Sequence, residues 1–252
     1  MKLCVMLLAF SISTGIPTIQ NQSKDKDDEA RNVDKAAQLI GKGDVSGIKK
    51  MISSGLDVNA SDKFGQTLLM IAALHGQLEI SRFLLSNDIN VDQKSEDGLT
   101  ALMYAAHAGD VQIVSLIISR GADVNNRDKN GVTPLIRASE LGYPDIVKLL
   151  IQSGSDLKLA NLNGETPMML SHKDCVAPLL LSGADLNAQD NNGFTALMHA
   201  VTRNDPDKTS MLTEEGADVT VKTKRGLTAL KLARLLSYPE LIKVLLKAGA
   251  GE

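Results

Sequence analysis

The segment from Ser171 to Cys175 brings together residue types that take part in nucleophilic and metal chemistry. It reads serine, histidine, lysine, aspartate and cysteine. A cysteine beside a histidine is a possible nucleophile, and imidazole, carboxylate and thiolate groups are the usual protein ligands of zinc. No second pair of ligands with suitable spacing accompanies this segment. An enzyme or metal protein centred on 171–175 is therefore one hypothesis, and a buried structural cysteine is the other.

Glycines at regular intervals place this segment in a larger pattern. Three successive steps of 33 residues are followed by one step of 29 and a further step of 33. The glycines are Gly65, Gly98, Gly131, Gly164, Gly193 and Gly226. A repeat of this length is typical of a stacked array of small helical units, each touching only its neighbours. Asp62, Asp128 and Asp190 are expected to close Asx turns just ahead of the glycines.

A threonine two residues after each glycine predicts the start of a helix. A threonine hydroxyl at the N-cap accepts a hydrogen bond from an amide of the first helical turn. The threonines are Thr67, Thr100, Thr133, Thr166, Thr195 and Thr228. Proline follows at positions 134 and 167, where a helix needs no amide proton. Each unit therefore begins its first helix at a threonine.

A second helix is expected about thirteen residues after the glycine. Pro144, Pro206 and Pro239 stand there, each followed by an acidic residue that suits a first helical turn. The first helix must end just before, in a turn with left-handed backbone. The residues expected to make that turn are Gly76, Gly109, Gly142, Asn204 and Ser237. Each unit is therefore a pair of helices joined by a tight turn.

The unit that contains Gly164 is four residues shorter than the others, and the missing residues fall between its helices. In the register of the repeat, Cys175 takes the place of Ile113 and Ile146, on the inward side of the second helix. A cysteine at such a position is usually an inert small hydrophobe. The register therefore favours a structural cysteine. Pro178 predicts that the second helix of this unit is kinked or shortened.

The pattern resembles the ankyrin repeat family, whose motif runs aspartate, two variable residues, glycine, one variable residue, Thr-Pro-Leu-His, paired alanines and Gly-Ala-Asp-Val-Asn. The resemblance covers about 32–252 and implies an all-α solenoid of stacked helix-turn-helix units with short hairpin loops, about seven units including both caps. The expected boundaries are 32–61 for the N-terminal cap, 62–94, 95–127, 128–160, 161–189 for the short irregular repeat, 190–222, and 223–252 for the C-terminal cap.

The N-terminal residues are typical of a secretory signal peptide. Residues 1–15 hold a lysine, an apolar stretch and then small residues, and the stretch is too short for a membrane span. Residues 16–31 are expected to form a polar linker. We therefore expect an exported protein, periplasmic or secreted, with no integral membrane span after cleavage. A buried N-terminal helix, or an uncleaved segment that tethers the chain to a membrane, is the alternative.

Composition narrows the classes of partner. The net charge is −3, the sequence pI is near 5.8, and aromatic residues make up 3% with no tryptophan. Nucleic-acid binding normally requires a basic surface, so it is not expected. Of the two cysteines, Cys4 lies in the expected signal and Cys175 is alone in the mature part, which leaves no intrachain disulfide.

The resemblance implies a non-catalytic module that binds another protein through the concave face formed by hairpins and first helices. Four of the six residues that follow the turn glycines are apolar, and apolar groups gathered on an exposed face usually mark an interaction surface. The alternative is that these side chains only pack adjacent hairpins together. The candidate partner-binding residues are Phe64, Gln66, His75, Leu99, His107, Val132, Glu140, Leu141, Phe194, Arg203, Arg225 and Leu227. No catalytic residue, metal site or cofactor is expected, and the chain is expected to be a monomer.

Overall fold

The structure is a computed structural model that describes residues 31–251. The expected signal peptide at 1–15, and the linker at 16–31 except for its last residue, lie outside this range. Residues 31–41 are helical. The remaining helices are α2 Val45–Ser53, α3 Leu68–Leu74, α4 Leu78–Leu84, α5 Ala101–Ala108, α6 Val111–Ser119, α7 Pro134–Leu141, α8 Pro144–Gln152, α9 Pro167–Leu170, the 3-10 helix η1 Lys173–Cys175, α10 Val176–Leu181, α11 Ala196–Thr202, α12 Pro206–Glu214, α13 Ala229–Leu235 and α14 Pro239–Lys247.

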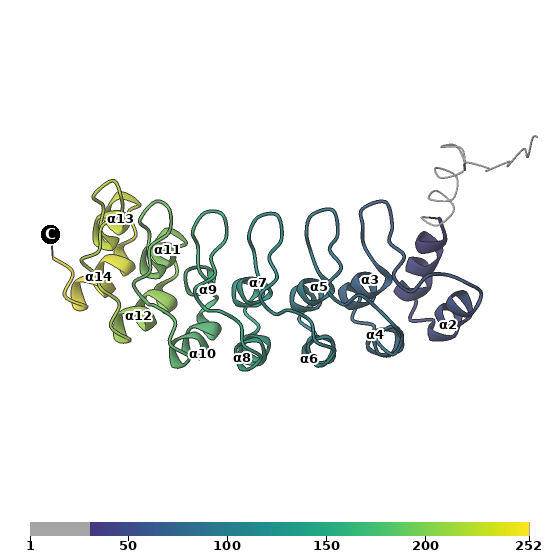
Figure 1. Ribbon diagram of the computed structural model, residues 1–252. Coiled ribbons are helices and arrows are strands. Elements are labelled where there is room, and N and C mark those ends of the chain that lie inside the picture. Colours follow the sequence, from purple (N-terminus) through teal and green to yellow (C-terminus); the bar gives the residue numbers. More distant parts are fainter. Residues whose placement is uncertain (1–30, 252) are drawn as a thin grey trace, which may run out of the picture.

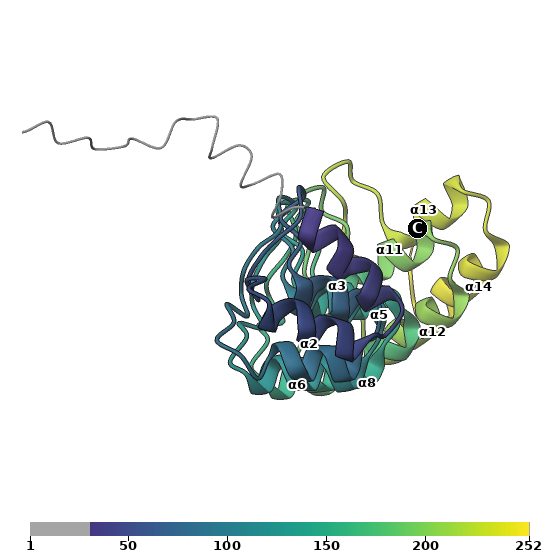
Figure 2. The same cartoon turned by 90° about the vertical axis from the view of Figure 1, so that its right-hand side faces the viewer.

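The helices form a curved single row of pairs. The first helices of successive units pack against one another, from α3 through α5, α7, α9 and α11 to α13. The second helices lie along the convex edge, and a hairpin loop projects from each junction on the opposite side (Figure 1). The view from the N-terminal end shows α2 in front of the row and the C-terminal helices α12, α13 and α14 displaced to one side (Figure 2). The all-helical solenoid predicted from the repeat is therefore confirmed.

Helix starts follow the threonine pattern with one exception. The Thr100 side chain accepts a hydrogen bond from the amide of Met103, and the same cap is made by the threonines at positions 67, 133, 195 and 228. Thr166 makes no such bond, and its hydroxyl is buried without a partner. The left-handed turns also stand where they were expected, and Asn204 and Ser237 adopt φ values of 53° and 58°. Five of the six predicted caps are confirmed.

Backbone hydrogen bonds join each hairpin to the next. The amide of Glu96 donates to the carbonyl of Phe64 at 2.9 Å, and the amide of Lys129 donates to the carbonyl of Asp97 at 3.0 Å. The same bond, at 2.9 Å each, runs from amide to carbonyl in the pairs Leu162 to Asn130, Asn191 to Asn163, and Lys224 to Asn192. These five bonds form a hairpin ladder. The three predicted Asx turns are confirmed, because Asp62, Asp128 and Asp190 each accept two backbone amides, from the second and the fourth residue that follow.

The short repeat is irregular, as its length predicts. Its first helix, α9, has only four residues, and a turn of 3-10 helix separates it from the six-residue α10. Pro178 lies in the first turn of α10, where its missing amide proton interrupts no intrahelical bond. The second helix is thus shortened from its N-terminal side, and the proline fits the shortened form.

A buried lysine from the following repeat binds the broken end of α9. Lys208 is 2% exposed and takes the place in α12 that Ile146 takes in α8. Its Nζ donates to the carbonyl oxygens of Met168 at 3.3 Å and Met169 at 3.2 Å, and to that of Ser171. A helix end leaves carbonyls without intrahelical partners, and Lys208 satisfies three of them. We call this arrangement the Lys208 cage.

Candidate functional site

The segment 171–175 separates into a buried thiol and an exposed contact between a histidine and an aspartate. Cys175 is fully buried, and burial, followed by the negative charge of Asp174, raises the pKa of its thiol to about 11. His172 and Asp174 are exposed and pair through Nδ1 and Oδ2 at 3.1 Å. A thiolate is the reactive form of cysteine, and this thiol keeps its proton. The predicted burial of Cys175 is confirmed, although the residue ends the 3-10 helix η1 and does not lie within the second helix α10.

The twelve candidate partner-binding residues lie on the hairpins and at the ends of the first helices. They differ in how far they reach the solvent. The exposed members are Phe64, His75, His107, Glu140, Leu141, Arg203 and Arg225. The half-buried members are Gln66, Leu99, Val132, Phe194 and Leu227. The residues that directly follow the turn glycines are therefore set deeper than the tips beside them.

The half-buried members support the concave face from beneath. Phe194 and Leu227 pack against the hydrophobic core, and the Phe194 ring centroid lies 5.7 Å from that of His199. The Gln66 side-chain amide donates to the Tyr104 hydroxyl at 2.7 Å. These side chains tie each hairpin to the first helices, so replacing them would change stability as well as any contact with a partner.

Two further exposed apolar side chains, Leu162 and Leu74, are not among the residues predicted from the sequence. Leu162 is 66% exposed, two residues before Gly164, and Leu74 is 39% exposed at the end of α3. Phe64 is 54% exposed at the adjoining hairpin position. The signal for Leu162 was present, because a leucine stands where Lys63 and Lys129 stand in their repeats.

Glu165, Asp190 and His199 form a cluster across two repeats. Their facing oxygen and nitrogen atoms all lie within 4.8 Å of one another. His199 Nε2 is 3.0 Å from Asp190 Oδ2 and 4.0 Å from Glu165 Oε1. Burial lowers the pKa of His199 below its ordinary value, against the opposing effect of the two carboxylates. The imidazole is therefore neutral at pH 7.

This cluster could not be found from the repeat alone. The repeat predicts only a turn role for Asp190, and His199 stands at a different position of its repeat from His75 and His107. Glu165 belongs to the preceding repeat. The three residues meet because the hairpin of one repeat lies beside the first helix of the next.

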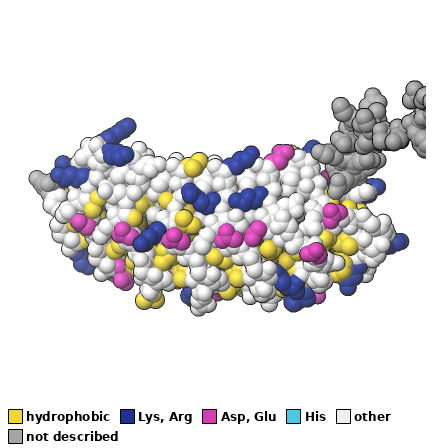
Figure 3. All heavy atoms as spheres, viewed as in Figure 1, with side chains coloured by type: hydrophobic (Ala, Val, Ile, Leu, Met, Phe, Trp, Pro, Cys, Tyr) yellow, Lys and Arg dark blue, Asp and Glu magenta, His cyan; other side chains and the backbone are white. Residues whose placement is uncertain are grey.

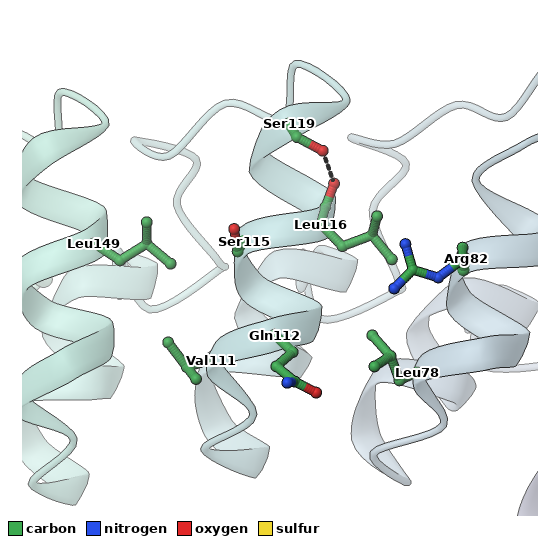
Figure 4. A pocket seen from close by; sticks show the side chains of 8 residues that line it. All are labelled: Leu78, Arg82, Val111, Gln112, Ser115, Leu116, Ser119 and Leu149. Atoms are coloured by element: carbon green, nitrogen blue, oxygen red, sulfur yellow. Dashed lines mark hydrogen bonds between the residues drawn. The ribbon is translucent and has the colours of Figure 1, made fainter.

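A shallow groove of about 550 Å³ lies on the convex side, between α4, α6 and α8. Leu78 and Arg82 of α4 face residues 111–119 of α6, and Leu149 of α8 closes the far side (Figure 4). Within it, the Ser119 hydroxyl donates to its own helix, to the carbonyl of Leu116 at 2.7 Å. The groove is open to solvent, and it is the ordinary gap between the side chains of neighbouring helices.

On the face seen in Figure 3, charged side chains of both signs are spread along the surface. In the space-filling view, acidic groups run along the middle of the molecule, and basic groups lie above and below them and at the C-terminal end (Figure 3). Within residues 31–251, every helix is too short or too polar to cross a bilayer.

Comparisons with known proteins agree with this architecture. The sequence matches a family model described as "Ankyrin repeats (3 copies)" in the overlapping segments 35–128, 92–161, 120–190 and 168–251. Among solved structures, the chain is similar to the crystal structure of the human ASB11 ankyrin repeat domain, with 22% sequence identity and a TM-score of 0.77. That match covers 86% of this chain and 98% of the other. The comparison with curated proteins finds no match.

Proposed function

The chain belongs to the ankyrin repeat family, and from this premise we propose that it is a non-catalytic module that binds another protein through its concave face. Ankyrin repeats are generally protein–protein interaction modules. The mechanism is complementarity between a preformed surface and its partner. Because the stacked repeats already hold that surface in place, little conformational entropy is lost on binding.

The exposed apolar groups of the concave face carry this proposal. Phe64, Leu141 and Leu162 are 54%, 39% and 66% exposed at hairpin tips or first-helix ends. Large apolar side chains of this kind serve as anchors when a partner covers them. Exposed polar residues such as His107 and Arg203 lie at comparable positions of other repeats and provide a polar rim. A surface of about 800 Å² per partner is usual for such complexes.

The setting proposed for this interaction follows from the N-terminal sequence. The chain acts as a monomer in the periplasm or outside the cell, after removal of residues 1–15. The intact mass of the purified exported protein tests this directly. A mass that still includes residues 1–15 would favour the membrane-tethered alternative.

Two matched double variants test the face. Phe64→Ser with Leu141→Ser removes two exposed apolar groups from the concave face, and Val111→Ser with Leu181→Ser removes two from the second helices on the convex edge. All four residues are at least 39% exposed. The experiment is crosslinking and pull-down from the compartment that holds the mature chain. The amount of partner captured by the concave variant should be at least tenfold lower than that captured by the wild type, since anchor residues dominate binding.

The convex variant is the control for stability and solubility. Its capture of the partner should equal that of the wild type, and both variants should melt within a few degrees of it. Equal loss of the partner from both variants would contradict binding through the concave face. Capture that survives in the concave variant alone would move the interface to the second helices.

A further inference from the structure

We propose that Glu165, Asp190 and His199 form a binding site for a first-row divalent metal ion, of which Zn²⁺ is the best fit. Two carboxylates and one imidazole supply oxygen and nitrogen ligands and a charge of −2 that a divalent ion neutralises. The three groups come from two repeats, with Glu165 on the hairpin before α9 and the other two in the next repeat. The site is independent of which partner the concave face binds.

The separations of the ligand atoms are close to those of a zinc site. In tetrahedral zinc centres, ligand atoms lie about 2.0–2.2 Å from the metal and therefore roughly 3.4 Å from each other. Here the pairs that include His199 Nε2 measure 3.0 Å to Asp190 Oδ2 and 4.0 Å to Glu165 Oε1, and all three atoms lie within 4.8 Å. Small side-chain rotations bring them around one ion. Three protein ligands then leave one position for water.

Each ligand side chain is held by a contact that leaves its metal-facing atom available. Glu165 Oε2 accepts from the side-chain amides of Asn161 at 2.7 Å and Asn163 at 3.2 Å, which leaves Oε1 toward the cluster. Asp190 Oδ1 accepts two backbone amides, at 2.8 and 2.9 Å, which leaves Oδ2. Outer contacts of this kind orient ligands and strengthen metal binding.

The histidine is also prepared for coordination. The Phe194 ring packs against it, and His199 is mostly buried at the edge of the concave face. In the metal-free protein Nε2 lies within hydrogen-bonding distance of Asp190 Oδ2, at 3.0 Å. When a metal binds, the ion lies between these two atoms, and the neutral imidazole carries its proton on Nδ1. The positive charge of Arg203 acts on His199 as well and opposes metal binding, while the two carboxylates outnumber it.

The bound ion would tie the short repeat to the next one. Glu165 precedes the four-residue helix α9, whose threonine cap is missing. An ion shared by Glu165, Asp190 and His199 therefore fastens the hairpin of the weakest repeat to the neighbouring helix α11. The expected consequence is a higher melting temperature in the presence of the metal.

Isothermal titration calorimetry on the full chain, stripped with a chelator and dialysed, tests the site with ZnCl2. One ion should bind per chain and raise the melting temperature, and MgCl2 at the same concentration should not. His199→Gln and Glu165→Gln should each weaken binding more than tenfold, and Asn163→Ala about tenfold. Circular dichroism checks that each variant is folded, and Glu165→Gln keeps the shape of the side chain.

The matched controls are His172→Gln and Glu140→Gln, which remove the same residue types elsewhere on the surface. Both should bind zinc like the wild type. The proposal is overturned if no saturable binding occurs, if magnesium binds equally well, or if Glu165→Gln binds zinc as tightly as the wild type. Binding that is lost in His172→Gln instead would assign the ion to the exposed pair of His172 and Asp174 as an adventitious site.

Discussion

Replacement of Lys208 by methionine is expected to destabilise the array by about 3 kcal/mol, although the side chain stays long, unbranched and apolar along its stem. The variant loses the Nζ donor, which leaves the carbonyls of Met169 and Ser171 buried without it, while the Met168 carbonyl keeps its bond from the Ser171 hydroxyl at 2.9 Å. A buried polar group deprived of its partner costs about 1–3 kcal/mol, and partial relaxation of the loop reduces the sum. Urea denaturation at pH 7 measures the loss.

Insertion of the missing residues should rescue this variant. Alignment of the short repeat with its predecessor places the gap directly after Ser171, where the preceding repeat has Ser139, Glu140, Leu141 and Gly142. With Ser-Glu-Leu-Gly inserted there, α9 can continue and bind its own carbonyls, so an apolar residue at 208 becomes the better choice. The insertion should therefore stabilise the methionine variant and destabilise the wild type. Equal effects of the insertion in the two backgrounds would contradict the Lys208 cage.

The stability difference between the wild type and Lys208→Met is expected to depend on pH. Burial lowers the pKa of Lys208 from 10.5 to about 7, with a further contribution from the charge of Arg203, while the negative charge of Asp205 opposes the shift. Between pH 7 and 10.5 the unfolded chain holds a proton that the native state releases, so the contribution of Lys208 to stability rises with pH. The free-energy gap between wild type and Lys208→Met should widen from pH 7 to pH 9. Exposed Lys173→Met serves as the control and should show no such widening.

Substitution of Gly193 by alanine is expected to cost several kcal/mol more than the same change at Gly226. Both glycines have left-handed backbone, with φ of 82° and 75°, so each pays the conformational cost of about 1 kcal/mol. A Cβ at Gly193 would lie 2.8 Å from the backbone nitrogen of Lys224 and 3.0 Å from Cα of Thr223, whereas nothing lies within 4 Å of one at Gly226. The difference measures the contact with the next hairpin, about 2–3 kcal/mol when packing must shift.

Gly121→Ala distinguishes the effect of the contact with the next hairpin from the effect of an internal position in the array. Gly121 is internal like Gly193 and has φ of 84°, but open space surrounds its Cβ position. Its loss of stability in urea denaturation should match that of Gly226→Ala. If all three variants lose the same free energy, the hairpins tolerate the extra methyl group, and backbone conformation alone explains the glycine repeat.

The regular part of the fold could be predicted because its determinants are local. A threonine cap, an Asx turn and a left-handed residue act within a few positions of themselves, so Asn204 and Ser237 could be assigned without a glycine. The irregular repeat was also visible, since a gap of four residues leaves too little chain for a full first helix. Burial of Cys175 followed from its register.

What could not be predicted depends on contacts between repeats. Lys208 stands in a column of buried isoleucines, and nothing local says that its ammonium meets the carbonyls of a helix in the previous repeat. The cluster around His199 likewise combines a turn residue with a glutamate from another hairpin. The half-buried setting of Phe194 depends on packing against the core. In each case the sequence identifies the residue but does not say which residue of another repeat it contacts.

The hairpin ladder has a consequence for how this protein can change over evolution. Its bonds connect residues 32 positions apart at four junctions and 28 apart at the fifth, yet the bond from Asn191 to Asn163 has the same 2.9 Å length as its neighbours. The missing four residues shorten the helices α9 and α10, while the spacing between the hairpin loops stays the same. An insertion or deletion between the helices can therefore be inherited without misaligning the loops on either side. A binding surface formed by successive loops can then persist when the length of a repeat changes.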